Sequence, residues 1–600
     1  MTKLAIDSRR GPPASLPGSH SRYKLLQFCC WCVALALGAA DAWAARFTMF
    51  PDGVSYLDVG DAFWGGNFHD AINAYWSPLY PCVLGLFLKI FKPSVYWEYP
   101  LVHLMNFVLY AAALVCFAAF LNILIEQLEL SKEDATRSEI GLPVWAWYIA
   151  GYSAFVSSAL LLISVRFPSP DMMVAALLFL ASALLLKIRT GKATWGTFVS
   201  LGLVLGIAYL AKAVMFLLAV PFLLVTTAVQ WNALRRVGYP QIHHTFAGTK
   251  TLNHSPLRNL KPVVLCLLTF VVVAFPFVFL LSARKHRPTF GDSGRINYEI
   301  TVNQVQFFIP QEKTIHPVGR IPGVPDAFEY AKPIGGTYPL WFDPSYWHEG
   351  LEAHFQLLRQ LRMLGLSLLT CAWISFNVFL GLGITTALFV LYLSSPSIRH
   401  CLTIARSNWE LWIPSVSGIG LYCLVVVEPR YVAGMFCVLW LVAFSGVRLP
   451  CSRATRRLFA GVVLGMAAAT CLISGWQSFR AWKGIGITEK HIATAICWQV
   501  AEAIHSRGIR PGDTIAVVAT WLVPDQEASY VARLARVRIV AEARPEGFWA
   551  LEAARSQFAA EVKKVGGKAI LAYQPPRTEQ GWERLANTDY YLYRLTSSAD

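Results

Sequence analysis

Apolar runs recur along most of the chain, separated by short polar segments. A helix of about 20 residues is long enough to cross a hydrocarbon core about 30 Å thick. The pattern therefore predicts roughly eleven membrane-spanning helices between residues 25 and 475. They are expected near residues 25–45, 100–125, 143–164, 171–187, 194–211, 213–230, 262–282, 373–394, 409–427, 431–447 and 458–475.

Two long segments interrupt this series of spans, at residues 46–98 and 283–363. The first contains "WSPLYPCVLGLFLKIFK", whose length and bounding prolines predict a helix lying in the membrane interface. The second ends in "EGLEAHFQLLRQLRML", residues 349–364, where helical spacing of apolar residues predicts an amphipathic helix on the membrane surface. We expect both segments to lie on the outer face.

The pattern changes at residue 476. Strands are predicted at "DTIAVVA", "VRIVAEA", "KAILAYQ" and "DYYLYRL", alternating with helices near 489–507, 526–536 and 548–565. This alternation is typical of a soluble α/β domain. The predicted fold is an all-α polytopic membrane domain, residues 25–475, followed by a C-terminal α/β domain, residues 476–600.

Residues 1–24 are basic and rich in Pro, Gly and Ser, which predicts a disordered tail. Ala42-Trp43-Ala44 imitates a signal-peptidase site, but the long apolar stretch before it and the spans that follow favour an uncleaved anchor. Across the chain, 55% of residues are hydrophobic and 15% are charged, as in a polytopic membrane protein.

The net charge of +16 comes from short basic clusters rather than from one soluble face, so nucleic acid is not an expected partner. With a cytoplasmic N-terminus, these clusters all fall on the cytoplasmic side, as the positive-inside rule requires. An odd number of crossings then places the C-terminal domain outside, in the periplasm if the membrane is a bacterial inner membrane. The clusters lie at residues 9–24, 187–192, 235–236 and 453–457.

The same topology gathers ionisable residues on the outer face. Asp52, Tyr56 and Asp58 follow the first span, Arg166 and Asp171 lie in "SVRFPSPDMM", and Lys212 lies in "AYLAKAVMF". A later group, Glu428, Arg430 and Tyr431, lies in "VVVEPRYVAG". Ionisable groups at helix ends mark a site or a structural pair. Cations with carboxylates suit a phosphorylated lipid, because cations neutralise phosphate and a carboxylate accepts a proton from an attacking hydroxyl.

These motifs, in this order over residues 25–475, resemble the GT-C membrane glycosyltransferases. The nearest likeness is to the protein O-mannosyltransferase-like and aminoarabinose-transferase-like branches. Members pass a sugar from a polyprenyl-phosphate carrier to a lipid, glycan or protein acceptor on the outer face, usually with inversion. The resemblance implies a hexosyl- or pentosyltransferase with these substrates as partners.

The resemblance also implies roles for individual residues. Asp52 matches the family's acidic residue, which acts as base or orients the acceptor, and Asp58 or Asp171 supplies a second carboxylate. Lys212, Arg430 and Arg166 would hold the departing lipid phosphate, with Tyr431, Glu428 and Tyr56 also at the substrate. The chain departs from the family pattern at two places: Gly53 stands where many relatives have Glu, and Ala213 stands where the usual residue is Gly.

Structural readings compete with these roles. Asp52 before Gly-Val-Ser-Tyr is also a good helix N-cap, Asp171 a dipole partner at a helix start, and Asp61 a solvated residue. Lys212 and Arg430 could instead extend to the lipid headgroups. Four aromatic residues suit either a sugar-stacking wall or the interfacial aromatic belt, and the belt is the default interpretation: Trp64, Tyr75, Trp76 and Tyr80.

Other chemistries fit the sequence less well. His348, Glu349, Glu352 and His354 lack a metal-binding spacing, and the family includes metal-dependent and metal-independent enzymes, so cofactor dependence stays open. "GDSGR", residues 291–295, resembles a protease nucleophile loop without partners, and a turn over the membrane site explains it better. The alternative function is a lipid or solute transporter, but transporters usually place ionisable groups near the midplane.

Overall fold

The computed structural model describes most of the chain. The described residues are 23–130, 139–237, 260–306, 314–330, 335–376, 381–483, 489–519, 527–575 and 580–595. The residue 1–24 tail therefore lies almost wholly outside them.

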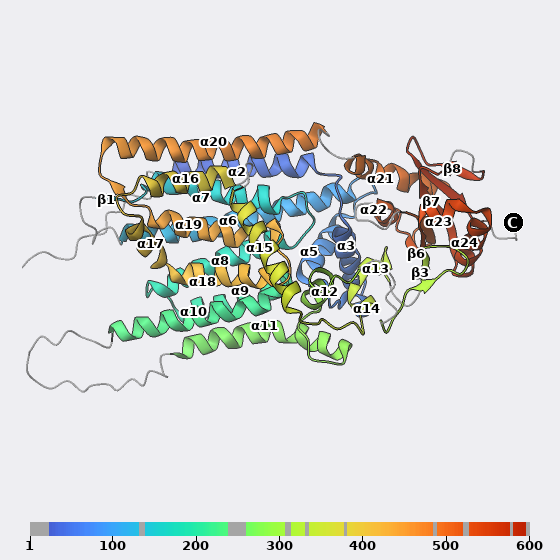
Figure 1. The fold of residues 1–600 in the computed structure, drawn as a ribbon, viewed down its shortest axis with the longest axis horizontal. Helices are drawn as coiled ribbons and strands as arrows, with labels where there is room; N and C mark the ends of the chain where they lie inside the picture. Colours follow the sequence, from blue (N-terminus) through green and yellow to red (C-terminus); the bar gives the residue numbers. More distant parts are fainter. Residues whose placement is uncertain are drawn as a thin grey trace, which may run out of the picture.

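A bundle of long helices forms one end of an elongated molecule, and a sheet-containing domain forms the other (Figure 1). Within the described residues, nine helices of at least 18 residues are apolar enough to cross a membrane. The chain is thus an integral multi-pass membrane protein. The bundle comprises α2 (Lys24–Ala44), α6 (Glu98–Leu130), α7 (Val144–Val156) continued by the π-helix η1 (Ser157–Ile163), α8 (Asp171–Arg189), α9 (Trp195–Ala211), α10 (Val214–Val237), α11 (Lys261–Lys285), α15 (Leu357–Phe376), α16 (Gly381–Leu393), α17 (Ile398–Arg406), α18 (Trp409–Cys423), α19 (Pro429–Gly446) and α20 (Arg453–Lys483).

The predicted spans correspond to these helices, except between residues 349 and 394. The surface helix predicted at 349–364 is wrong, because residues 351–356 have no regular structure and α15 begins only at Leu357. Helix α15 continues through Gly365 to Phe376 and is long and apolar enough to span a membrane. The span predicted at 373–394 therefore begins earlier, and α16 forms its second part.

Short helices make a layer between the bundle and the sheet domain (Figure 1). Two of them, α3 and α5, pack so closely that a Cβ on Gly60 would lie 2.5 Å from the Pro81 oxygen. The segment predicted as an interfacial helix is indeed helical, as α5. The layer comprises α3 (Pro51–Trp64), α4 (Phe68–Ala71), α5 (Leu79–Phe91), α12 (Ser293–Thr301), α13 (Pro339–Phe342) and α14 (Pro344–Trp347).

Among the described residues, the sheet has seven strands in the order β2-β3-β6-β5-β7-β9-β8. The central strand β5 is parallel to β6 and β7, with Ile515 opposite Ile539 and Ala569, and the outer strands are antiparallel. All four predicted strands are present. The strands are β2 (Gly319–Arg320), β3 (Ala327–Glu329), β5 (Thr514–Val518), β6 (Arg538–Ala543), β7 (Gly567–Tyr573), β8 (Trp582–Arg584) and β9 (Tyr590–Arg594).

Successive side chains along the strands point to opposite faces of the sheet, and each face packs in a different hydrophobic core. Ile515 and Val517 pack in the same core as α21 (Glu489–Ser506) and α22 (Glu527–Leu534), which is continuous with the membrane bundle. Ala516 and Val518 face a separate core with α23 (Pro545–Ala550) and α24 (Glu552–Lys564). The domain is therefore a three-layer α/β/α sandwich, in which β2 and β3 come from the outer segment 283–363.

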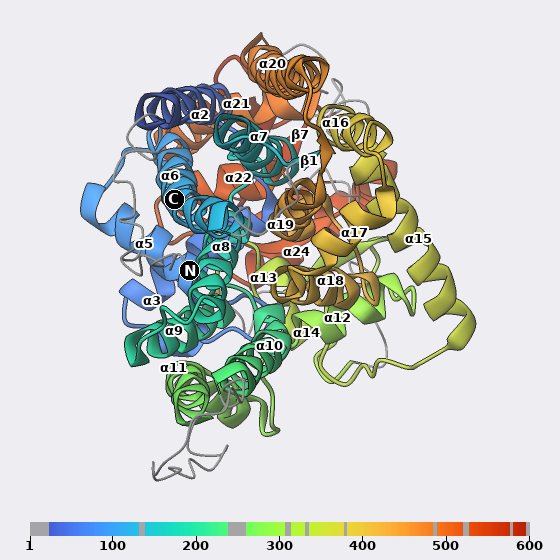
Figure 2. The same cartoon turned by 90° about the vertical axis from the view of Figure 1, so that its left-hand side faces the viewer.

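A small ladder lies at the opposite end of the bundle. There β1 (Glu139–Ile140) pairs with β4 (Leu449–Pro450), next to the start of α20 and its basic residues. A view along the bundle from this end shows the helices packed side by side (Figure 2). The bundle thus separates this end from the end that carries Asp52.

Candidate active site

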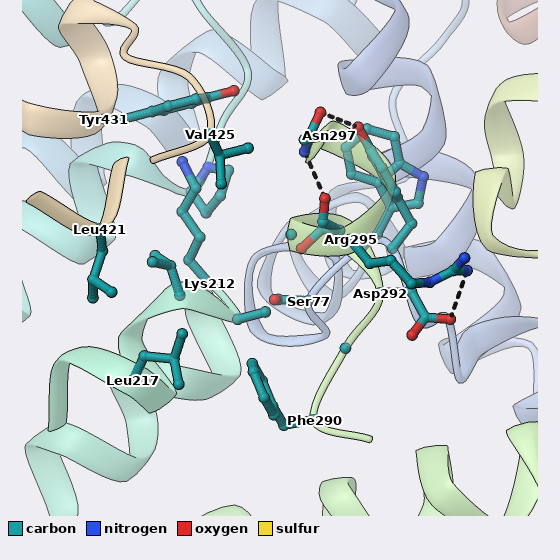
Figure 3. A pocket seen from close by; sticks show the side chains of 18 of the residues that line it. Ser77, Lys212, Leu217, Phe290, Asp292, Arg295, Asn297, Leu421, Val425 and Tyr431 are labelled. Carbon is teal, nitrogen blue, oxygen red and sulfur yellow. Dashed lines mark hydrogen bonds and ion pairs between the residues drawn. The ribbon is translucent and has the colours of Figure 1, made fainter. Parts of the chain in front are cut away.

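A cavity of about 560 Å³ lies where the bundle meets the layer of short helices. Lys212 and Tyr431 lie on one side, with Asp292, Arg295 and Asn297 opposite (Figure 3). Leu217, Phe290 and Leu421 form an apolar part of the wall. One cavity thus combines charged groups with a surface that an apolar chain can contact.

Asp52 enters this cavity from the first turn of α3. Pro51 fixes the start of the helix, and a carboxylate in the first turn is favoured by the helix dipole. The N-cap is Phe50, so the capping reading of Asp52 is wrong. The indole N–H of Trp341 donates to the Asp52 carboxylate at 3.2 Å, and an Arg430 nitrogen lies 3.5 Å from its other oxygen.

The surroundings of Asp52 affect its proton affinity. Burial raises its pKa above the ordinary value of 3.8, and the nearby Arg430 guanidinium opposes that rise. A carboxylate with a raised pKa is a stronger base toward a hydroxyl proton. The location and the proton affinity of Asp52 both suit proton transfer.

Lys212 occupies the junction between α9 and α10, where its extended backbone ends α9. Its ammonium lies 2.5 Å from an oxygen of Asp171 and 3.5 Å from the centre of the Tyr431 ring. Asp171 is buried at the start of α8. The carboxylate and the ring therefore hold the ammonium at the cavity wall.

Arg430, at the start of α19, connects the carboxylates of the site. Its Nε atom lies 2.7 Å from Glu428 and 3.7 Å from Asp171, and its Nη2 atom is the one near Asp52. Two cations and three carboxylates thus meet from α3, α8, α9 and α19. Tyr56, one helical turn after Asp52, lines the same cavity.

The "GDSGR" segment forms the opposite wall of the cavity, but it is not simply the predicted turn, because Ser293, Gly294 and Arg295 begin α12. The amide N–H of Asp292 donates to the carbonyl of Ala74 at 2.7 Å. Arg287 and Arg295 pair with Asp292 and Glu299 at 2.6 and 2.7 Å respectively. Of the four aromatic residues considered, Tyr75 and Trp76 line the cavity, which favours their interpretation as a wall of the site, whereas Trp64 and Tyr80 do not line it.

Asp58, Arg166 and Asp61 do not line the cavity, and Glu428 contacts the site through Arg430 without lining it. Asp58 pairs with Arg533 at 2.8 Å and accepts two hydrogen bonds from Thr337. Arg166 donates to Asp41 of α2 at 2.7 Å. Asp61 is not simply solvated, because it pairs with Arg533 and Arg536 at 2.7 and 2.6 Å. Of the two carboxylates considered beside Asp52, the structure brings Asp171 to the cavity and leaves Asp58 out.

Sequence reasoning missed several cavity residues. Trp341 reaches Asp52 from α13, and Tyr422 of α18 stacks on Tyr431 with ring centres 5.2 Å apart. Their positions depend on the path of the 283–363 segment and on the rotation of α18, neither of which the hydropathy pattern encodes. For Arg166, the isolated Asp41 in an apolar run was a usable signal of a buried partner.

The described residues hold no group of three or more His, Cys, Asp and Glu side chains with a metal-binding arrangement. In the cluster considered for a metal, His348 lies 3.4 Å from Glu299 and Glu349 lies 3.2 Å from His316. Both pairs form within the 283–363 segment, and they do not bring the four residues together as ligands of one metal ion.

No protein-family model matches the sequence, and no curated protein matches it. Solved structures do match. The crystal structure of ArnT from Cupriavidus metallidurans bound to undecaprenyl phosphate is 12% identical, with a TM-score of 0.51, and the match covers 97% of this chain and 99% of that one. The apo structure of the same protein is 11% identical, with a TM-score of 0.50, and the match covers 94% of this chain and 98% of that one. The chain has the fold of ArnT.

The apo oligosaccharyltransferase of Archaeoglobus fulgidus is also similar, at 13% identity and a TM-score of 0.45, with 92% of this chain and 70% of that chain covered. The two ArnT structures match this chain over nearly their whole length. The ArnT fold includes both the membrane bundle and the domain after it, so the fold predicted from the sequence is confirmed.

Proposed function

We propose that the protein is a membrane glycosyltransferase that transfers a sugar from a polyprenyl-phosphate donor to a lipid, glycan or protein acceptor on the non-cytoplasmic face. The observation that carries this proposal is the meeting of Asp52, Asp171, Lys212 and Arg430 in one cavity. The fold supports it, because ArnT has been crystallised with undecaprenyl phosphate. The transferred sugar is a hexose or a pentose.

In the proposed reaction, Asp52 accepts the proton of the acceptor hydroxyl as its oxygen attacks the anomeric carbon. The bond between that carbon and the phosphate oxygen breaks, and the lipid phosphate leaves with the electron pair. Attack from the side opposite the phosphate inverts the anomeric centre. Lys212 and Arg430 stabilise the negative charge that develops on the departing phosphate.

Asp171, Glu428, Tyr431 and Tyr56 have supporting roles in this scheme. Asp171 contacts both cations and keeps them at the wall, rather than acting as a second base. Glu428 contacts Arg430, and the Tyr431 ring lies against the Lys212 ammonium. The incoming phosphate then competes with carboxylates for two cations that are already in position.

The test uses purified protein in nanodiscs with a labelled polyprenyl-phosphate sugar and candidate acceptors. Asp52→Asn keeps the shape of the side chain and removes its basicity, so transfer should fall by about 100-fold or more. Asp70→Asn, on an exposed pair with His69, is the matched control and should transfer like the wild type. Wild-type rates for Asp52→Asn would exclude the assigned base. Lipid flipping without a covalent product would instead support a transporter.

A further inference from the structure

A single arginine of the C-terminal domain holds α3, in the layer of short helices, and α6, in the bundle. Arg533, at the end of α22, is 2% exposed and contacts three carboxylates. It lies 2.8 Å from Asp58 and 2.7 Å from Asp61, both on α3, and 2.8 Å from Glu98 at the start of α6. Each of these contacts crosses from the C-terminal domain to the membrane domain.

Arg536 extends the same network. Its guanidinium lies 2.6 Å from Asp61 and 2.7 Å from Glu98, so it joins the same two elements. The Tyr99 hydroxyl adds a hydrogen bond of 2.7 Å to the carbonyl of Tyr530. Because a buried ion that loses its partner is strongly destabilised, α22 and α3 are held together as one unit.

Helix α3 carries the network at one end and Asp52 at the other. Asp58 follows Asp52 by six residues, a rise of about 9 Å along a helix. The backbone of α3 is in close contact with α5, since a Cβ on Gly85 would lie 2.8 Å from Gly60. A rigid helix fixed at Asp58 and Asp61 therefore also fixes where Asp52 enters the cavity.

A second connection reaches Asp52 along α13. Thr337 donates its amide N–H and its hydroxyl to Asp58, at 2.7 and 2.9 Å. The Tyr338 hydroxyl donates to Glu542 of β6 at 2.8 Å. Trp341, three residues later, donates to Asp52 itself. The C-terminal domain is thus connected to Asp52 in two ways: through α3, and through Trp341, which donates a hydrogen bond to Asp52.

We propose that Arg533 is a positioning residue for Asp52, and that a function of the C-terminal domain is to hold α3 in the orientation that the reaction needs. This proposal rests on the proposed role of Asp52 as the base. Arg533 does not touch the cavity, and the groups assigned to the donor phosphate, Lys212 and Arg430, come from other elements. The expected defect is therefore in the rate of the chemical step rather than in donor binding.

The test compares Arg533→Met and Arg533→Lys in the full-length protein. Because a displacement of about 1 Å can lower a rate about 100-fold, kcat should fall by about 10- to 100-fold in Arg533→Met, with the donor KM within about twofold of the wild type. Arg533→Lys should recover part of kcat. Arg584→Met removes an arginine that pairs with Asp589 at the far edge of the same sheet, and it should leave both constants unchanged.

Hydrogen–deuterium exchange gives a readout that does not depend on activity. Amides of α3 should exchange faster in Arg533→Met than in the wild type, while α8 and α19 stay unchanged. Asp58→Asn keeps an acceptor for Thr337 while removing a charge next to Arg533, so it should show the same change more weakly even if Arg533→Met folds poorly.

Unchanged α3 exchange, a normal kcat, or a defect confined to the donor KM would each overturn the proposal. If the wild type transfers no sugar while α3 exchange still rises, the proposed function fails and only the mechanical link stands.

Discussion

At the scale of single residues, the packing around Gly53 bears on the position where the resemblance implies an Asp-Glu pair and this chain has Asp52-Gly53. A Cβ at position 53 would lie 2.5 Å from the Met49 sulfur and 3.1 Å from the Pro168 Cβ. A larger side chain at position 53 therefore requires the Met49 side chain and the 165–170 connection to shift. A second carboxylate therefore reaches the cavity from α8, as Asp171.

This packing makes a prediction for Gly53. Gly53→Ala should lower stability by about 1–3 kcal/mol, because it overpacks a filled site, and Gly53→Glu should abolish sugar transfer by displacing the start of α3. Thermal unfolding and the transfer assay measure the two effects. Gly420→Ala is the control, since a Cβ there would meet nothing within 4 Å. An active Gly53→Glu enzyme would show that the site has room for the relatives' Glu.

The candidate site could be predicted from the sequence only in part, and the reason is again local. Asp52, Asp171, Lys212 and Arg430 each stand at a helix end, so counting membrane crossings places them all on one face. Asp58 stands only six residues after Asp52 and shares that face, but its side chain points to Arg533. The direction in which a helix presents each side chain depends on its packing partners, and the partner of Asp58, Arg533, lies 475 residues further along the chain.

At the scale of elements, the outer segment 283–363 contributes to the C-terminal sheet. Its strand β3 pairs with the predicted strand β6, with Phe328 opposite Glu542, and β2 pairs with the other edge of β3. A three-residue strand is too short to produce a recognisable alternation, so sequence reasoning could not find it. Glu542 is buried at this junction and accepts hydrogen bonds from the hydroxyls of Tyr330 and Tyr338.

Glu542 makes the junction sensitive to pH. Its burial raises its pKa from 4.5 to about 7, although the two tyrosine hydroxyls and Arg544 oppose the rise. Between these values the folded chain binds more protons than the unfolded chain, so stability should fall as pH rises from about 4.5 to 7 and then level off. In Glu542→Gln, the unfolding temperature should change less over this range.

Thermal unfolding of the full-length protein at several pH values between about 5 and 7.5 checks this expectation. Glu561→Gln, which removes a carboxylate paired with Lys564 on α24, is the control and should keep the pH dependence of the wild type. Equal slopes for Glu542→Gln and the wild type would assign the dependence to another group.

At the scale of the whole molecule, hydropathy and charge together predicted the architecture. Long apolar helices are distinctive because the bilayer core sets their length. Basic clusters at residues 187–192 and 453–457 lie at the end of the bundle opposite the cavity, as the positive-inside rule expects for an outer-face site. The joint between the two domains was not predictable, because it depends on ion pairs such as that between Arg533 and Glu98.

The orientation of the whole molecule decides which compartment supplies its substrates. If the positive-inside rule holds, Cys451, which is exposed beside the basic residues at the start of α20, faces the cytoplasm. A cysteine placed at Arg584, whose side chain is 52% exposed in the C-terminal domain, then faces the outside. A membrane-impermeant maleimide on intact cells should label Arg584→Cys and leave Cys451 unlabelled, as mapped by peptide mass spectrometry. Permeabilised cells should gain label at Cys451, and this gain should be lost in Cys451→Ser. Because both reporters belong to one chain with a fixed number of crossings between them, the reverse pattern would place the cavity on the cytoplasmic side and require a donor whose sugar is presented there.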